Sequence, residues 1–146
     1  MDEIGRLSVE QIEETSWPDP PADATRLMKT VHELRRKPIR ELTPEDLRVL
    51  IRQREGIQAL LPRALELLAH NPLTEGDYYP GDLLVAILEI PSDYWANNSI
   101  PVTITEIIQK IEHMGDLGQH FAPHEEIWKS IQHFRTDTKN LPREPN

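Results

Sequence analysis

Residues 43–51 read TPEDLRVLI and contain the clearest helix start in the chain. The Thr43 side chain can cap free backbone amides, and Pro44 suits the first helical position, where its missing N–H costs nothing. The acids Glu45 and Asp46 face the positive end of the helix dipole. The apolar residues that follow recur at helical spacing and form one stripe: Leu47, Leu50 and Ile51. This stretch therefore predicts an amphipathic helix.

The same pattern extends in both directions, with prolines between the apolar segments. Proline makes up 13 of the 146 residues, and most prolines lie where one helix should end and the next begin. The segment 57–70 has the broadest apolar face and is the candidate central helix, with Pro62 predicting a kink or a later start. The expected helices cover residues 8–14, 27–37, 43–56, 57–70, 83–89, 104–115 and the segment that begins at Pro123.

Two short apolar segments leave the secondary structure open. Residues 83–88 can form a buried strand as well as a helix, and we favour a helix because Asp82 can serve as its N-cap. Residues 102–105 also have a weak strand pattern. We predict an all-α fold, a single compact domain of six or seven short helices over residues 1–146, with frayed termini at 1–7 and 136–146. The alternative is an α+β fold with a minor strand element.

Composition narrows the class of protein. The chain has 25 acids, 16 bases and a formal net charge of −9, with the acids concentrated toward both ends and a basic middle. This balance argues against nucleic-acid binding and favours a basic protein partner. The chain has no cysteine, which excludes a disulfide framework and a thiol nucleophile. Because it also lacks a secretory signal and a long apolar run, we expect a cytoplasmic protein that does not enter a membrane.

No constellation of residues points to catalysis. The chain has no phosphate-binding glycine loop and no nucleophile elbow, and Pro123 separates His120 from His124, so that the two are unsuited to one metal-binding helix. We therefore expect no enzyme activity, no metal and no cofactor. Two alternatives stay open: an adaptor that contacts nucleic acid through Arg35–Arg40, and an unrecognised hydrolase.

Two longer motifs are similar to a known family. Residues 37–48 read KPIRELTPEDLR and residues 75–84 read EGDYYPGDLL, and with Trp17 and the prolines after it the likeness runs from about residue 16 to residue 96. This combination resembles the immunity proteins of contact-dependent growth inhibition (CDI). The resemblance implies a small cytosolic inhibitor, not an enzyme, which neutralises the toxic C-terminal domain of a delivered surface protein. Because such toxins are commonly nucleases, it also implies a partner with a basic groove.

The resemblance divides the candidate residues into two groups. Family members neutralise different toxins, so the shared motif residues are expected to maintain the fold, with Glu75, Asp77 and Asp82 as loop-fixing and capping groups. The structural group is Thr43, Pro44, Asp46, Glu75, Gly76, Asp77, Tyr78, Tyr79, Pro80, Gly81 and Asp82. Toxin contacts are expected from acids and aromatic residues outside the motifs: Asp93, Tyr94, Trp95, Glu112, Asp116, Glu125 and Glu126.

Overall fold

The structure, a computed structural model, describes residues 2–95 and 99–139, and it is all-α. The described residues form eight α-helices and three 3-10 helices, and no strand. The first α-helix is a single turn of four residues, so the seven others agree with the predicted number. Residues 83–88 and 102–105, which had a possible strand pattern, both lie in helices. The prediction of an all-α single domain is confirmed.

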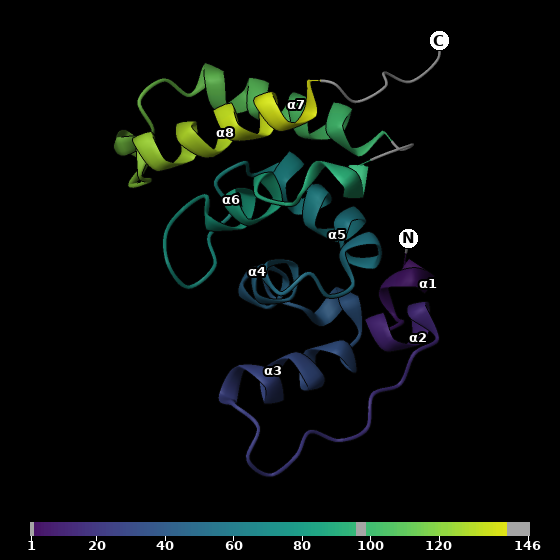
Figure 1. The fold of residues 1–146 in the computed structure, drawn as a ribbon. Helices are drawn as coiled ribbons and strands as arrows, with labels where there is room; N and C mark the ends of the chain where they lie inside the picture. Colours follow the sequence, from purple (N-terminus) through teal and green to yellow (C-terminus); the bar gives the residue numbers. More distant parts are fainter. Residues whose placement is uncertain (1, 96–98, 140–146) are drawn as a thin grey trace.

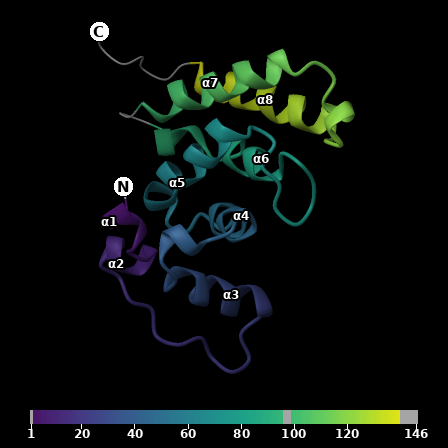
Figure 2. The same cartoon turned by 180° about the vertical axis from the view of Figure 1, so that it is seen from behind.

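The α-helices stack in layers (Figure 1). The outermost layer holds α7 and α8, the next holds α5 and α6, and α4 and then α3 follow, with α1 and α2 at one side; the view from behind agrees (Figure 2). The α-helices are α1 (Asp2–Gly5), α2 (Val9–Glu13), α3 (Arg26–Arg35), α4 (Pro44–Arg52), α5 (Ile57–His70), α6 (Asp82–Leu88), α7 (Ile100–His113) and α8 (His124–Thr138). The 3-10 helices are η1 (Ile39–Glu41), η2 (Ser92–Trp95) and η3 (Leu117–His120).

The most deeply buried α-helix is α6, whereas residues 57–70, predicted to be the central helix, form α5, which packs against α2, α4, α7 and η1. Every residue of α6 is buried, and the helix packs between α4 and α8. Its run from Leu83 to Leu88 is apolar all round, which suits a helix without a solvent-facing side. In contrast, α5 has an exposed face, and Pro62 lies on it within the helix.

The local start signals work as predicted. In α2 the Ser8 hydroxyl accepts the N–H of Gln11 at 3.1 Å, and the Gln11 side chain accepts the N–H of Ser8 at 2.9 Å. In α4 the Thr43 hydroxyl accepts the N–H of Asp46 at 3.1 Å, and the Asp46 carboxylate accepts the N–H of Thr43 at 3.0 Å. Both pairs are capping boxes, which satisfy donors that have no partner within the helix.

The two segments predicted to be frayed contain helical residues. The first, residues 1–7, includes α1, and the second, residues 136–146, includes the last residues of α8. Met1 and residues 140–146 lie outside the described residues.

Candidate functional site

The two sequence motifs meet in space through Glu45, at the start of α4. One oxygen of its carboxylate accepts the backbone N–H of Asp77 at 2.9 Å. The carboxylate also accepts two hydrogen bonds from the Arg48 guanidinium, at 2.7 Å each. A bidentate pair of this kind fixes the orientation of both side chains. The first turn of α4 therefore holds the loop that carries the second motif.

Asp82 fixes this loop from the other side. Its carboxylate is almost fully buried and accepts the backbone N–H of Gly76 at 2.6 Å and that of Tyr78 at 3.0 Å. The predicted N-cap role is wrong, because Asp82 is the first residue of α6 and the capping position belongs to Gly81, which has no side chain to cap with. The predicted loop-fixing role of Asp82 agrees with its contacts.

At two glycines of the loop, a larger residue would collide with neighbouring side chains. A Cβ atom on Gly76 would lie 2.6 Å from a Glu45 carboxylate oxygen and 3.0 Å from an Asp82 oxygen. Gly81 has a φ of +97°, and a Cβ atom there would lie 2.7 Å from Cδ1 of Ile127 on α8. The loop therefore closes against both α4 and α8 only because these positions lack side chains.

Glu45 and Arg48 each stabilise the charged form of the other. The hydrogen bonds that Arg48 donates to Glu45 lower the pKa of the carboxylate and raise the pKa of the guanidinium. Since the Glu45 pKa is lower in the folded state, its contribution to stability is present above its ordinary pKa of 4.5 and is lost as the pH falls through the lowered value. Arg48 also lies 4.4 Å from the centre of the Tyr78 ring, which is 70% exposed. The cluster therefore presents an aromatic ring to solvent on a rigid base.

A polar groove with a volume of about 740 Å³ lies beside this loop. Its floor is α6, and its walls are α4, the loop and α8, which contribute Arg48, Arg52, Tyr78, Tyr79, Glu126 and Lys129 among others. Arg52 forms an ion pair with Glu89 of the same groove. Burial, with the negative charges of Glu126 and Asp82, raises the pKa of Tyr79, so that its hydroxyl stays protonated and can donate. Because the groove is lined by both cations and anions, it suits contact with a protein that carries both charges better than binding of a small ligand with a single charge.

Three of the predicted contact acids lie near the start of α8. Asp116 caps η3 by accepting the N–H of Gly118 at 2.9 Å, and Glu125 and Glu126 are exposed in the first turn of α8. Glu126 also lines the groove. These acids therefore border the same end of the molecule as the Tyr78 loop, at the left of Figure 1.

The other predicted contact residues lie elsewhere. The Ser92 N–H donates to Asp137 at 3.0 Å, which places the exposed Asp93 and the half-buried Tyr94 by the C-terminal end of α8, about 18 Å of helix from Glu125. Glu112 forms an ion pair with Arg135 at 3.2 Å.

Trp95 is not a surface residue. Only 1% of it is exposed, and it belongs to the hydrophobic core. The prediction that Trp95 contacts the toxin is wrong, because burial removes its indole from the reach of a partner.

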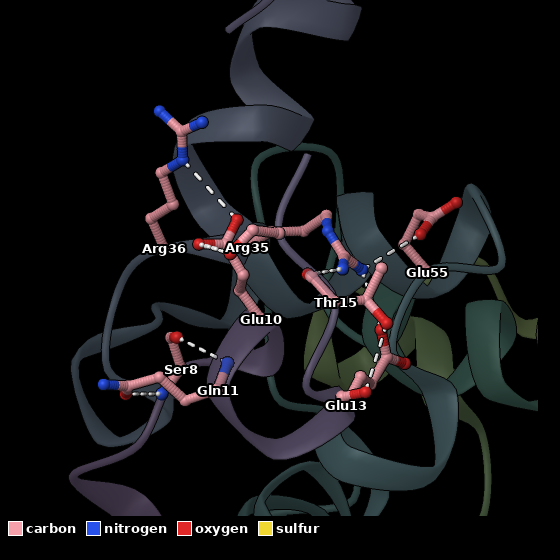
Figure 3. A network of polar contacts seen from close by, with 9 residues as sticks. Ser8, Glu10, Gln11, Glu13, Thr15, Arg35, Arg36 and Glu55 are labelled. Carbon is pink, nitrogen blue, oxygen red and sulfur yellow. Dashed lines mark hydrogen bonds and ion pairs between the residues drawn. The ribbon is translucent and has the colours of Figure 1, made fainter. Parts of the chain in front are cut away.

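The basic run from Arg35 to Arg40 is largely used within the molecule (Figure 3). Arg35 is 1% exposed, and its guanidinium donates to Glu13 at 2.9 Å, to Glu55 at 3.2 Å and to the Thr15 carbonyl at 3.2 Å. Arg36 pairs with Asp19 and Glu10, and Lys37 pairs with Asp46. A surface that contacts phosphates needs accessible cations, and these three already have anionic partners.

The alternative of a metal site through His120 and His124 has no support from the residues that the structure describes. No three His, Asp or Glu side chains converge there on a site for a metal ion. His120 is exposed, and Nδ1 of His124 accepts the N–H of Leu117 at 3.0 Å.

Sequence reasoning missed several residues that border the groove and the acidic end. Arg52, Lys129 and His133 line the groove, and the exposed Phe121 lies just before α8. For Arg48, which also lines the groove, the sequence does contain a local signal: it lies three residues after Glu45, a spacing that brings the two side chains to one face of a helix. The other residues come together through helix packing that the sequence pattern does not contain.

A sequence-family model described as CDI immunity proteins matches residues 11–104, which include both motifs and the helices from α3 to α6. No curated protein matches the chain.

Proposed function

Because the chain belongs to the family of CDI immunity proteins, we propose that it neutralises a nuclease toxin domain by covering a basic surface of that domain. The family match over residues 11–104 is the observation that carries this proposal. It makes the cognate CDI toxin the partner, and the nuclease activity and the basic surface are the additions that we propose.

The charge distribution supports a basic partner. Glu125 and Glu126 have no Lys or Arg within ion-pair distance among the described residues, whereas Glu45, Glu89 and Glu112 are each paired with an arginine. Unpaired, exposed acids produce a negative potential that attracts a basic protein and speeds association. We propose that the end of the molecule with Asp116, Glu125 and Glu126 faces the toxin. Asp93 and Tyr94, by the C-terminal end of α8, are proposed as contacts at the edge of that interface.

The proposed mechanism is stoichiometric binding in the cytoplasm, not catalysis. None of the helices in the described ranges is long and apolar enough to cross a membrane. An inhibitor that works by occlusion needs one molecule for each toxin molecule, so protection depends on its affinity and its concentration relative to the toxin.

The test uses the C-terminal toxin domain of the cognate CDI surface protein, produced by cell-free synthesis. We expect that domain to degrade RNA or DNA and that added immunity protein will suppress the activity linearly up to one equivalent. Inactivation by a small fraction of an equivalent would instead identify an enzyme. An active domain that the immunity protein neither binds nor inhibits would contradict the proposed function.

Reversing the charge of Glu125 and Glu126 to lysine should slow association with the toxin domain about tenfold at low salt and flatten its salt dependence. Both acids are exposed, so the fold should survive with a loss of a few tenths of a kcal/mol for each acid at the helix start. Stopped-flow association at several salt concentrations measures the first effect, and thermal melting measures the second.

A matched control separates local charge from net charge. Glu33 on α3, the layer farthest from α8, and Glu41 in η1, which packs against α1 and α5, are exposed acids, and their reversal to lysine changes the net charge equally. This control should leave most of the association rate unchanged. Equal slowing by the two double variants would show that only the total charge of the protein matters.

A further inference from the structure

Phe121 is an aromatic side chain that the fold leaves in solvent. It is 89% exposed, more than any other large hydrophobic residue in the described ranges, where Tyr78 follows at 70%. A single exposed apolar residue is ordinary in itself. Phe121 differs because its neighbours in the chain are tied down on both sides.

The backbone around Phe121 is fixed by short-range contacts. The N–H of Phe121 donates to the Gly118 carbonyl and that of Ala122 to the Leu117 carbonyl, both at 3.1 Å. Leu117 and Ala122 are buried, so the turn is anchored in the core on either side of the exposed ring. Phe121 has a φ of +64°, a conformation that is uncommon for a bulky residue. The backbone at Phe121 is therefore fixed in a conformation that leaves the ring in solvent.

Exposed acids lie on both sides of Phe121 in the sequence. Asp116 lies before it, and Glu125 and Glu126 follow in the first turn of α8, all exposed. Asp116 has no Lys or Arg within ion-pair distance among the described residues, and Nδ1 of His124 lies 3.5 Å from its carboxylate. An aromatic centre with a charged rim is the usual arrangement of an interface in which a few residues carry most of the binding energy.

We propose that Phe121 is the apolar anchor of the toxin interface and inserts into an apolar pocket rimmed by lysine and arginine on the toxin domain. This inference rests on the proposed function and adds the contact that sets the lifetime of the complex. The charge of the rim selects a basic partner. Phe121 also lies outside the residues 11–104 that match the family, where contacts specific to one toxin are expected.

The test compares Phe121→Ala with Val102→Ala, because Val102 is another exposed apolar residue, on α7 and 53% exposed. Binding to the same toxin domain is measured by surface plasmon resonance. Loss of a central anchor should weaken binding about 30-fold or more, mainly through faster dissociation. Val102→Ala should bind within about twofold of the wild type.

A third variant keeps the test independent of folding. Phe121→Asn places a residue that tolerates positive φ at this position, so the melting temperature should not fall while binding is lost. Phe121→Ala binding equal to that of the wild type would overturn the inference and leave the proposed function intact. Failure of the wild type to bind would overturn the proposed function itself. Dimers of the free protein that Phe121→Ala abolishes would also overturn the inference, because the ring would then serve self-association.

Discussion

Replacing Asp82 with alanine should lower the free energy of unfolding by about 3 kcal/mol, more than the loss of a helix cap would. The Asp82 carboxylate is 4% exposed and accepts N–H groups of Gly76 and Tyr78, with the Arg48 guanidinium 4.0 Å away. Without it, these donors lose their acceptor and Arg48 loses a nearby negative charge. Urea denaturation of the wild type and the variant measures the difference.

Two comparisons identify the cause. Asp77 lies in the same loop and carries the same charge, but its side chain is exposed, so Asp77→Ala should change stability by less than about 0.5 kcal/mol. Asp82→Asn keeps one acceptor oxygen and should fall between the wild type and Asp82→Ala. A loss of only about 1 kcal/mol for Asp82→Ala would mean that the loop amides find water instead, and would support a role no larger than a cap.

Local chemistry explains how much of the fold could be predicted. The capping boxes at Ser8 and Thr43 involve residues three apart, so the sequence contains every atom that the interaction needs. The helical stripe of α7 is equally local, because its buried residues Ile104, Ile107 and Ile108 follow the helical period. These features gave the all-α class and most of the helix positions.

Contacts between distant segments were not predictable. Asp82 is a residue type that is common at the N-cap. In the structure, however, Gly81 occupies the N-cap with a left-handed backbone conformation, and the Asp82 carboxylate accepts the N–H of Gly76 instead. The apolar run of α6 has no polar positions at helical spacing, so periodicity alone does not show that this segment forms a helix buried on every side. Trp95 looked like an anchor in a loop of aromatic residues, and its burial depends on packing against the whole core.

The candidate site follows the same division. The two motifs predicted which residues maintain the loop, and Glu45 joins them through contacts across 32 positions in the sequence. In contrast, no periodic or motif signal distinguishes Phe121, because its exposure results from how η3 joins α8. A residue that faces a partner is not required by the fold, so fold-based patterns do not reveal it.

Arg35→Ala is the second large expected change, with a loss of about 3 kcal/mol in the free energy of unfolding. Removing one partner from a buried ion pair leaves charge without compensation, and the cost is commonly 3–5 kcal/mol. The lower end applies here because the side chains of Glu13 and Glu55 are 39% and 30% exposed and water can reach them. The variant also loses the contact of Arg35 with the Trp17 ring, 4.2 Å from its centre, and the hydrogen bond to Thr15.

The neighbouring arginine provides the control. Arg36 makes comparable ion pairs but is exposed, so Arg36→Ala should lower the melting temperature far less than Arg35→Ala. Arg35→Lys should recover only part of the loss, because an ammonium cannot reproduce the fork in which Nη1 donates to Glu13 and Glu55 while Nη2 donates to the Thr15 carbonyl.

The pH dependence of the Arg35→Ala defect tests the electrostatic cause. Burial raises the pKa of Glu55 even though Arg35 opposes the shift, so removal of Arg35 should raise that pKa further. A carboxyl whose pKa is raised on folding favours the folded state at low pH and disfavours it as the pH rises through that value. The deficit of Arg35→Ala relative to the wild type should therefore shrink as the pH falls from 7 through the raised pKa of Glu55 toward its ordinary value of 4.5. A deficit that stays constant from pH 7 to pH 4 would attribute the loss to packing of the arginine stem against Trp17, and not to the unpaired carboxylates.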